Sequence, residues 1–272
     1  MADHGTGDGW DLIVTPWHLD EHIQAFPIPA NVTETIRPAL PAGPVPGRMT
    51  LLHQAVAGAV ARAARPLVLS GDCPTALGAV AGLQRRHRDL AVVWLDAHGD
   101  FNTPAITVSG YLGGMALAML TGRTPEFSDA LGLRPVADAG IVLAGARDLD
   151  PAERDALAAS EVRRVPADPA AITSALDGLG RTPVYLHLDV DVVDSAQLPG
   201  LRFPAGPGPA LTQIEECLSA VRAAANVTAA CIACAWLPGR VSDPAALQAI
   251  TRLARALGTD LRWREHTALA EA

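Results

Sequence analysis

The sequence predicts an α/β protein with three layers, in which helices cover both faces of a central, mostly parallel sheet. Short and almost continuously apolar segments alternate along the chain with segments of helical length. Hydrophobic residues make up 49% of the 272 residues and aromatic residues only 4%, which suits close packing of helices on a sheet. The segments 27–48 and 198–210 are rich in Pro and Gly but lie between elements of this same pattern. We therefore expect long loops of one domain over residues 1–272 rather than linkers.

The elements follow from apolar runs and from signals at helix starts. Strands are expected where apolar runs end in turn residues, at 11–16, 67–71, 91–96, 141–145, 184–190 and 229–236, with a further candidate at 161–165. Helices are expected between them, at 49–64, 75–87, 110–121, 152–160, 169–179, 212–225 and 244–257. Four of these helices begin with plausible capping residues, namely Asp150-Pro151, Asp168-Pro169, Thr212 ahead of Glu215, and Ser242-Asp243-Pro244.

The bulk composition narrows the classes of partner and compartment. Lys and Arg total 21 and Asp and Glu total 29, which gives a net charge of −8. An acidic chain is a poor general binder of nucleic acid, because phosphate recognition needs a basic surface. No apolar run approaches the roughly 20 residues that cross a bilayer, and the start of the chain lacks the basic and apolar regions of a signal peptide. We therefore expect a cytoplasmic protein that binds neither nucleic acid nor membranes.

The four cysteines are expected to be reduced thiols, since nothing in the sequence indicates export. Cys231 and Cys234 lie in a predicted strand and no second C-x-x-C pair completes a zinc site, so small buried residues are the simpler interpretation. Cys73 is different, because it follows a strand in "LVLSGDCPTALG", at the kind of strand end where α/β proteins bind ligands. Its thiol could be filler, a nucleophile or a metal ligand.

Two other predicted strands end in acidic clusters. The strand in "AVVWLDAHGDFN" runs into Asp96, His98 and Asp100, and the strand in "VYLHLDVDVVD" delivers Asp189 and Asp191 at alternate positions. Burying several carboxylates together is costly unless a cation compensates them. Solvated loop acids would explain one such cluster, but two clusters at the ends of apolar strands favour a site for hard divalent cations with room for two ions.

At these segments the chain resembles the ureohydrolase family, which includes arginases and agmatinases. "DAHGDFN" and "HLDVDVVDSAQLPG" resemble the family segments D-A-H-x-D-x-N and S-x-D-x-D-x-x-D-P-x-x-x-P-G, and "SGDCPTALG" resembles G-G-D-H-S. The order and spacing agree over nearly the whole chain. The resemblance implies an α/β/α fold, two Mn²⁺ ions per chain and hydrolysis of a guanidino group by a hydroxide that bridges the ions.

The resemblance also implies a ligand set for each ion. One ion would be bound by Cys73, Asp96, Asp100 and Asp189, and the other by Asp96, His98, Asp189 and Asp191. The family has histidine at the position of Cys73. A thiolate can replace an imidazole as a ligand, although it is softer than Mn²⁺ usually prefers. Its position favours the ligand role over filler, and a nucleophile is the least favoured because no histidine partner is apparent nearby.

Two further departures concern proton transfer. In arginases the histidine thought to act as general acid follows the D-A-H histidine by fifteen residues, and here "SGYLGG" places Gly113 at that position. His187 stands where the family usually has serine, on the same side of its strand as Asp189. It could support the site from behind, replace the missing acid, or be a structural histidine. We take Asp100 and His187 as the candidate catalytic residues.

The last departure concerns the substrate. Arginases place a glutamate near residues 231–238 that pairs with the guanidinium group, and "CIACAWLP" offers only Cys234 or Ala235 there. The resemblance nevertheless implies an intact amino-acid end, with Asn102 and Ser109 at the α-carboxylate and Asp150 and Glu153 at the α-amino group. Asp150 is also a plausible helix N-cap, and both roles can coexist.

Together these departures favour an α-amino acid with a guanidine less basic than that of arginine. Nω-hydroxy-L-arginine fits, and its products would be hydroxyurea and L-ornithine. The pattern resembles a branch of the family that acts in D-cycloserine biosynthesis, in which a cysteine replaces the metal-binding histidine and the acid histidine is absent.

Three alternatives remain open at this point. They are an arginase or agmatinase that releases urea, a single-metal amidohydrolase of the histone-deacetylase type, and a non-catalytic binding protein. A thiolate ligand could also favour zinc or iron over manganese. The tail "REHTALAEA" after Trp263 is shorter than the extended tail of trimeric arginases, so we expect a monomer.

Overall fold

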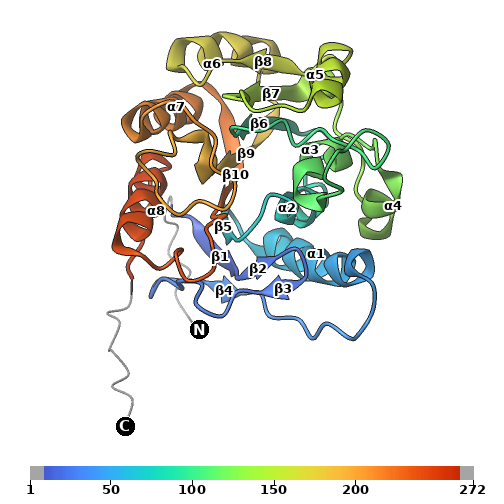
Figure 1. Ribbon diagram of the computed structural model, residues 1–272, viewed down its shortest axis with the longest axis vertical. Coiled ribbons are helices and arrows are strands. Elements are labelled where there is room, and N and C mark those ends of the chain that lie inside the picture. The colour runs from blue at the N-terminus through green and yellow to red at the C-terminus, as the bar shows by residue number, and fades with distance from the viewer. Residues whose placement is uncertain (1–8, 264–272) are drawn as a thin grey trace.

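A computed structural model describes residues 9–263 of the chain. Eight parallel strands form its central sheet in the order β4-β1-β5-β10-β9-β6-β7-β8 (Figure 1). Their bounds are β1 Asp11–Thr15, β4 Glu34–Thr35, β5 Pro66–Ser70, β6 Ala91–Leu95, β7 Ile141–Ala144, β8 Arg163–Val165, β9 Pro183–Asp189 and β10 Asn226–Ala233. β5 and β6 are buried along their whole length, as expected for strands covered on both faces.

Helices cover both faces of this sheet and give the three layers that the sequence predicts. On one face lie α6 (Pro169–Leu176), α7 (Leu211–Ala224) and α8 (Pro244–Ala256), and on the other lie α1 (Val45–Arg62), α2 (Thr75–Leu83) and α3 (Ala116–Leu120) (Figure 1). The short α4 (Pro125–Ser128) and α5 (Pro151–Ala158) complete the second group. The small side chains of α1 and α2 permit close packing, and a Cβ added at Gly78 would lie 2.6 Å from the His53 carbonyl oxygen.

All seven predicted strands are confirmed to within three residues at either end, including the weaker one at β8. The helix predicted at 110–121 is instead broken into a 3₁₀ turn, Leu112–Met115, followed by α3. The segment 27–48, predicted to be loop throughout, contains the edge strand β4 and the first turn of α1. A two-residue strand is too short to show an alternating pattern, and β4 is fixed by pairing with β1 instead.

The predicted helix caps are confirmed only in part. The Asp168 side chain accepts a hydrogen bond from the Ala171 amide at 2.9 Å, as an N-cap should. The prediction for Thr212 is wrong, because α7 begins one residue earlier and its N-cap is Ala210. Asp150 and Asp243 occupy N-cap positions, but their side chains make no capping hydrogen bond.

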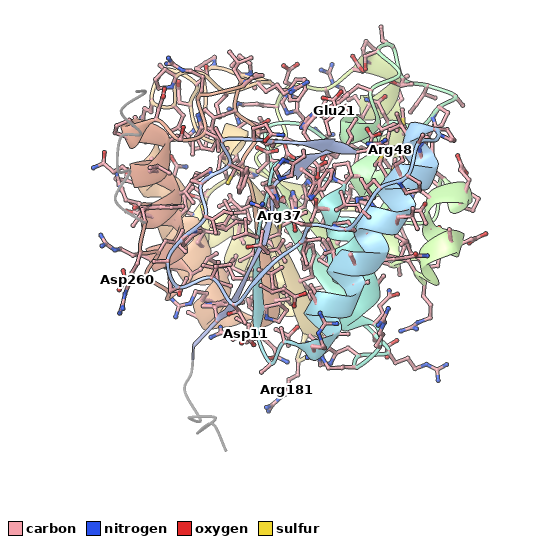
Figure 2. The ribbon with its side chains drawn as sticks, turned by 90° about the horizontal axis from the view of Figure 1, so that it is seen from below. Asp11, Glu21, Arg37, Arg48, Arg181 and Asp260 are labelled. Atoms are coloured by element: carbon pink, nitrogen blue, oxygen red, sulfur yellow. The ribbon has the colours of Figure 1, made fainter. Side chains whose placement is uncertain are left out.

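The two ends of the sheet differ in what they carry. Asp11 and Arg181, which lie at or just before the starts of β1 and β9, are at one end of the molecule, while Glu21 and Arg48 lie at the opposite end (Figure 2). At that opposite end a small antiparallel hairpin, β2 (Trp17–His18) and β3 (Glu21–His22), follows β1. The hairpin passes so close to the end of β5 that a Cβ at Gly71 would collide with the Trp17 carbonyl. This close approach requires glycine there.

Two further expectations from the sequence concern membrane-spanning helices and the oligomeric state. Over residues 9–263 no helix combines the length and apolarity needed to cross a bilayer. The tail on which the expectation of a monomer rests lies outside the described residues, so that expectation stays a prediction.

Candidate metal centre and its cavity

The predicted acidic clusters meet at the carboxyl edge of four neighbouring strands, β5, β10, β9 and β6. Cys73 follows β5, Asp96 follows β6, Asp189 is the last residue of β9, and Asp191 lies in the 3₁₀ turn directly after it. Because carboxyl ends of parallel strands share one edge of a sheet, residues more than 100 positions apart converge here. Cys73 Sγ lies 2.9 Å from Asp189 Oδ2 and 3.8 Å from Asp96 Oδ2.

Asp96 lies between two groups of candidate metal ligands. In the first, ligand atoms of Asp96, His98 and Asp191 all lie within 4.8 Å of one another. In the second, the same holds for Cys73, Asp96 and His187. The first group contains three of the four residues predicted for the second ion, without Asp189, and its His98 Nδ1 is 3.1 Å from Asp191 Oδ2 and 3.4 Å from Asp96 Oδ1. The second group contains Cys73 and Asp96 as predicted, lacks the predicted Asp100 and Asp189, and adds His187, which was not predicted as a ligand.

Electrostatics makes this cluster unfavourable on its own. Burial, together with the negative charge of Asp96, raises the pKa of Asp191 to about 7. Burial and the neighbouring carboxylates also raise the pKa values of Asp100 and Asp189 well above the ordinary range. The pKa of the Cys73 thiol rises well above its usual value for the same reasons, burial first and the charge of Asp189 second. The acids therefore resist full ionisation unless positive charge is supplied.

Histidine 98 supplies part of that charge. Burial by itself would lower the pKa of His98, but hydrogen bonds to Asp191 and Asp96 raise it to about 12. Burial likewise acts to raise the pKa of Asp96, but the hydrogen bonds and charge of His98 outweigh it and the pKa falls. In place of a proton on His98, a divalent cation would balance several carboxylates at once.

The donor set fits divalent cations. Asp100 Oδ2 and His187 Nε2 are buried and have no hydrogen-bond partner among the described residues. Buried polar atoms are normally satisfied, so such atoms beside a cluster of acids indicate a missing partner. Asp100 also has a φ of 48°, a left-handed conformation that is uncommon for a residue other than glycine. Strain of this kind is typical of functional sites.

A cavity of about 250 Å³ opens above the cluster. All four predicted acidic ligands, among them the candidate catalytic residue Asp100, line it together with Cys73 and His98. So do the four predicted substrate-binding residues, Asn102, Ser109, Asp150 and Glu153. His187 is fully buried and is not among the lining residues. Burial also lowers its pKa to about 3, so its imidazole is neutral near pH 7. This placement does not favour the predicted role of His187 as a substitute acid.

The predicted amino-acid end of the cavity is built around two loops. Asn102 Nδ2 donates a hydrogen bond to Asp150 Oδ2 at 3.3 Å. The carboxylate of Asp150 makes this contact and does not cap α5. Glu153 Oε1 accepts a hydrogen bond from the Phe101 amide at 2.8 Å, and Ser109 Oγ accepts one from the Tyr111 amide at 3.2 Å. The carboxylate side chains of Asp150 and Glu153 line the same cavity, an arrangement suited to an ammonium group.

Glu153 should also stabilise the loop that carries Asp100. Replacing Glu153 with alanine would leave the buried Phe101 amide without an acceptor, at a cost of about 1–3 kcal/mol. We expect the unfolding midpoint to fall by roughly 3–8 °C in calorimetry. Glu153→Gln keeps an acceptor oxygen and serves as the control, with a much smaller decrease. Equal decreases for both variants would contradict this role.

The structure reveals two site residues that sequence reasoning missed. The ring of Tyr111 fills the space beside Gly113, so that a Cβ at residue 113 would collide with it. Its hydroxyl lies 3.0 Å from His18 Nε2, and its ring packs against Phe203 with centroids 4.9 Å apart. Tyr111 and Phe203 line the cavity, and His18 lies behind them. An aromatic residue two positions before the unexpected Gly113 was the signal that could have indicated Tyr111.

The hydrogen bonds of His18 fix how Tyr111 is oriented. His18 Nδ1 lies 3.0 Å from the Gly71 carbonyl oxygen, which can only accept a hydrogen bond, so Nδ1 carries the proton. In the neutral ring Nε2 is then an acceptor, and the Tyr111 hydroxyl donates to it. The Tyr111 oxygen then keeps a lone pair that can accept a further hydrogen bond.

Comparison with known proteins agrees with this site. Residues 21–234 match the model of the arginase family. The chain is 36% identical over 158 residues to the Nω-hydroxy-L-arginine amidinohydrolase of Streptomyces lavendulae, covering 58% of this chain and 56% of that protein. It is 33% identical over 165 residues to an arginase of Staphylococcus aureus, covering 55% and 53%. The matched part thus spans only about half the length of these relatives.

Solved structures extend the likeness of fold to almost the whole chain. Arginase from Bacillus cereus superimposes with a TM-score of 0.78 at 22% identity, covering 92% of this chain and 99% of that one. Proclavaminate amidino hydrolase from Streptomyces clavuligerus gives a TM-score of 0.69 at 20% identity, covering 91% and 90%. The match over residues 21–234, carried by a fold with its acidic cluster at the expected strand ends, shows that the chain belongs to the arginase family.

Proposed function

We propose that the protein is an amidinohydrolase that hydrolyses Nω-hydroxy-L-arginine to hydroxyurea and L-ornithine, with two Mn²⁺ ions per chain. In this reaction water adds to the guanidino carbon, the bond from that carbon to the δ-nitrogen breaks, and the δ-nitrogen takes up a proton. The observation that carries the proposal is the composition of one part of the cavity wall. This part presents Gly113, Tyr111 and Ala235, where the family pattern leads one to expect a histidine and a glutamate.

That wall suits a neutral hydroxyguanidine better than a charged guanidinium. Ala235 offers no carboxylate to pair with a cation, and a buried cation without a partner is costly. The Tyr111 oxygen offers an acceptor for a donor such as the N-hydroxyl group. The similarity to a relative named as an Nω-hydroxy-L-arginine amidinohydrolase supports the same substrate.

The chain's own residues would hold the substrate and handle protons. Bound divalent cations would supply the nucleophile by lowering the pKa of a water molecule. Asp150 and Glu153 would bind the α-amino group, and Asn102 and Ser109 the α-carboxylate. Asp100 has an unpartnered Oδ2 and lines the cavity, so it is placed to take up the proton of that water and return it to the leaving amine.

A product assay tests this function. Protein loaded with Mn²⁺ is offered Nω-hydroxy-L-arginine, L-arginine and agmatine, and hydroxyurea and urea are measured separately. We expect kcat/KM for Nω-hydroxy-L-arginine to exceed that for L-arginine by at least tenfold. Comparable values, or a preference for agmatine, would reject this substrate in favour of an arginase or agmatinase, which the 33% identity to an arginase keeps as the second candidate. No turnover of any guanidino compound would favour a binding protein.

The hydroxyl of Tyr111 should matter for one substrate only. Tyr111→Phe keeps the ring that packs against Phe203 and removes only the hydroxyl of this cavity-lining residue. Losing one hydrogen bond of about 1–1.5 kcal/mol should lower kcat/KM for Nω-hydroxy-L-arginine roughly tenfold, with little change for L-arginine. Parallel decreases for both substrates would show that Tyr111 does not read the N-hydroxyl group.

We also propose a biosynthetic use for the product hydroxyurea and an oligomeric state for the protein. The resemblance of the substitutions at Cys73 and Gly113 to one branch of the family supports use of hydroxyurea in D-cycloserine biosynthesis. Accumulation of the antibiotic after deletion of the gene would contradict it. We expect a monomer, which light scattering would test.

A further inference from the structure

We propose that His187 is itself a metal ligand, binding through Nε2 the cation that Cys73 and Asp96 hold. This inference rests on the metal centre of the proposed function but not on its substrate. His187 was not predicted to bind metal from the sequence, because the family pattern has serine at this position.

The geometry brings His187 into one ligand group with the other two residues. A ring nitrogen of His187, the Cys73 sulfur and an Asp96 carboxylate oxygen all lie within 4.8 Å of one another. Protein ligands bind ions such as Zn²⁺ at about 2.0–2.3 Å, so ligands of one ion lie at most about 4.6 Å apart. The three atoms are therefore spaced on the scale of a shared ion.

One ring nitrogen of His187 lacks the hydrogen-bond partner that a buried polar atom requires. His187 is fully buried, and its Nε2 has no hydrogen-bond partner among residues 9–263. A buried imidazole nitrogen without a partner is unfavourable unless something outside the protein chain completes it.

The other ring nitrogen has the partner that a metal-bound histidine requires. His187 Nδ1 lies 3.4 Å from the hydroxyl oxygen of Tyr185, and that hydroxyl in turn hydrogen bonds to Cys231. If Nδ1 donates to Tyr185 and Tyr185 donates to Cys231, the proton is on Nδ1 and Nε2 is free. Metal-binding histidines usually donate their second N–H in this way, which fixes the tautomer and the ring orientation.

Trp94 holds two of the ligands in place. Its indole ring stacks on the His187 ring with centroids 3.6 Å apart and planes 14° apart. Its Nε1 donates to Asp96 Oδ2 at 3.1 Å. One side chain on β6 therefore positions both the imidazole from β9 and the carboxylate that follows β6.

The exchange of residue types fits this role. Compared with the family pattern, position 73 has lost an imidazole and position 187 has gained one, so the centre keeps a nitrogen ligand that now comes from β9. The Cys73, Asp96 and His187 group offers sulfur, oxygen and nitrogen, whereas the Asp96, His98 and Asp191 group offers only oxygen and nitrogen. The group that contains the Cys73 sulfur should bind softer ions such as Zn²⁺ or Co²⁺ more tightly than Mn²⁺.

Metal binding rather than activity tests the inference. The protein is dialysed against limiting Mn²⁺ or Co²⁺, and bound metal is measured by elemental analysis for the wild type, His187→Gln and His187→Ser. We expect one of two ions to be lost or to bind 10–100-fold more weakly in both variants. Cys73→Ala should show the same loss. Unchanged content and affinity in correctly folded His187 variants, with loss in Cys73→Ala, would overturn the inference and leave the proposed function intact.

His53→Gln is the matched control. His53 is also buried and its Nε2 also lacks a partner, but it belongs to neither ligand group. We expect unchanged metal content in this variant. Equal loss in His53→Gln and His187→Gln would show a general effect of core substitutions and would overturn the assignment.

A measurement on the unaltered protein avoids dependence on folding of the variants. Electron spin-echo spectroscopy of the Mn²⁺-loaded wild type, with and without ¹⁵N-labelled histidine, detects imidazole nitrogens bound to the metal. We expect signals from two imidazoles, those of His98 and His187, with one removed in His98→Asn. Disappearance of all imidazole signal in His98→Asn would overturn the role of His187. A wild type that binds no divalent ion would reject the proposed function as well.

Discussion

Replacing Asp96 with asparagine should abolish turnover, with kcat reduced by at least about 10³-fold, because Asp96 belongs to both groups of candidate ligands. Among the described residues Asp96 is the one that the two groups share. Elemental analysis of the dialysed variant should show most of both ions lost. The side chain keeps its size in asparagine, and the Trp94 indole can still donate to an oxygen at this position.

Asp148→Asn is a matched control for charge. Asp148 lines the same cavity and lies 3.9 Å from His98 Nε2, but its side chain is 67% exposed and it belongs to neither ligand group. We expect nearly wild-type metal content and kcat for this variant. A variant of Asp96 that retains both ions would instead show that the acidic cluster does not hold metal through this residue.

Metal-free protein should lose stability as the pH rises from 5 to 8, and metal should remove this dependence. In the folded state without metal, burial and the charge of Asp96 raise the pKa of Asp191 from 3.8 to about 7. The folded protein then holds a proton that the unfolded chain releases above pH 3.8. Its stabilising contribution is complete below that pH and is lost as the pH approaches and passes 7.

Asp100, Asp189 and His98 act in the same direction over this range. His187 acts in the opposite direction, because burial lowers its pKa from 6.5 to about 3 and its contribution to stability therefore rises as the pH rises to 6.5. The pKa values of Asp100 and Asp189 are also raised, and His98, with a pKa raised from 6.5 to about 12, loses stabilisation only as the pH rises above 6.5. The pKa of Asp96 is lowered, so its opposite effect falls below pH 4. We expect the unfolding midpoint to fall by roughly 5–10 °C between pH 5 and 8 after chelation.

Calorimetry at matched ionic strength, with and without Mn²⁺, would measure how the unfolding midpoint changes with pH. The metal-loaded protein should show little change over the same range, because the cations compensate the carboxylates that lose their protons. A metal-free midpoint that stays constant from pH 5 to 8 would contradict the raised pKa values.

The alternating pattern of the chain predicted the fold well. Strands β5, β6 and β9 are buried on both faces, so their apolar runs are visible without any knowledge of neighbours. The broken helix at 112–120 was not predicted, because Gly113 and Gly114 interrupt the turn next to the cavity while the surrounding residues remain apolar. The edge strand β4 was missed because only pairing with β1 defines it.

The candidate site was predicted in part, because several of its residues lie at or just after the ends of strands that are visible as apolar runs. Asp96, Asp189 and Cys73 follow strands, and the rule that parallel strands end at one edge brings them together. The roles of Tyr111 and His18 could not be predicted, because the two residues are 93 positions apart and meet only through the hairpin β2–β3 and the loop before α3. The hydrogen bond from His18 to Gly71 that fixes the tautomer is equally remote in sequence.

The sequence by itself determined the α/β/α architecture, the acidic cluster formed by residues at several strand ends, and the departures at Cys73, Gly113 and Ala235. The architecture and the cluster follow from local periodicity and from the order of residues along strands, which a single chain displays directly. The departures follow from comparing these segments with the family pattern. Only the tertiary structure decided that Tyr111 fills the space beside Gly113 and that His187 lies with Cys73 and Asp96 rather than at the cavity wall. The physical reason is that side-chain packing between neighbouring strands and loops, here the stacking of Trp94 on His187, selects which groups face one another.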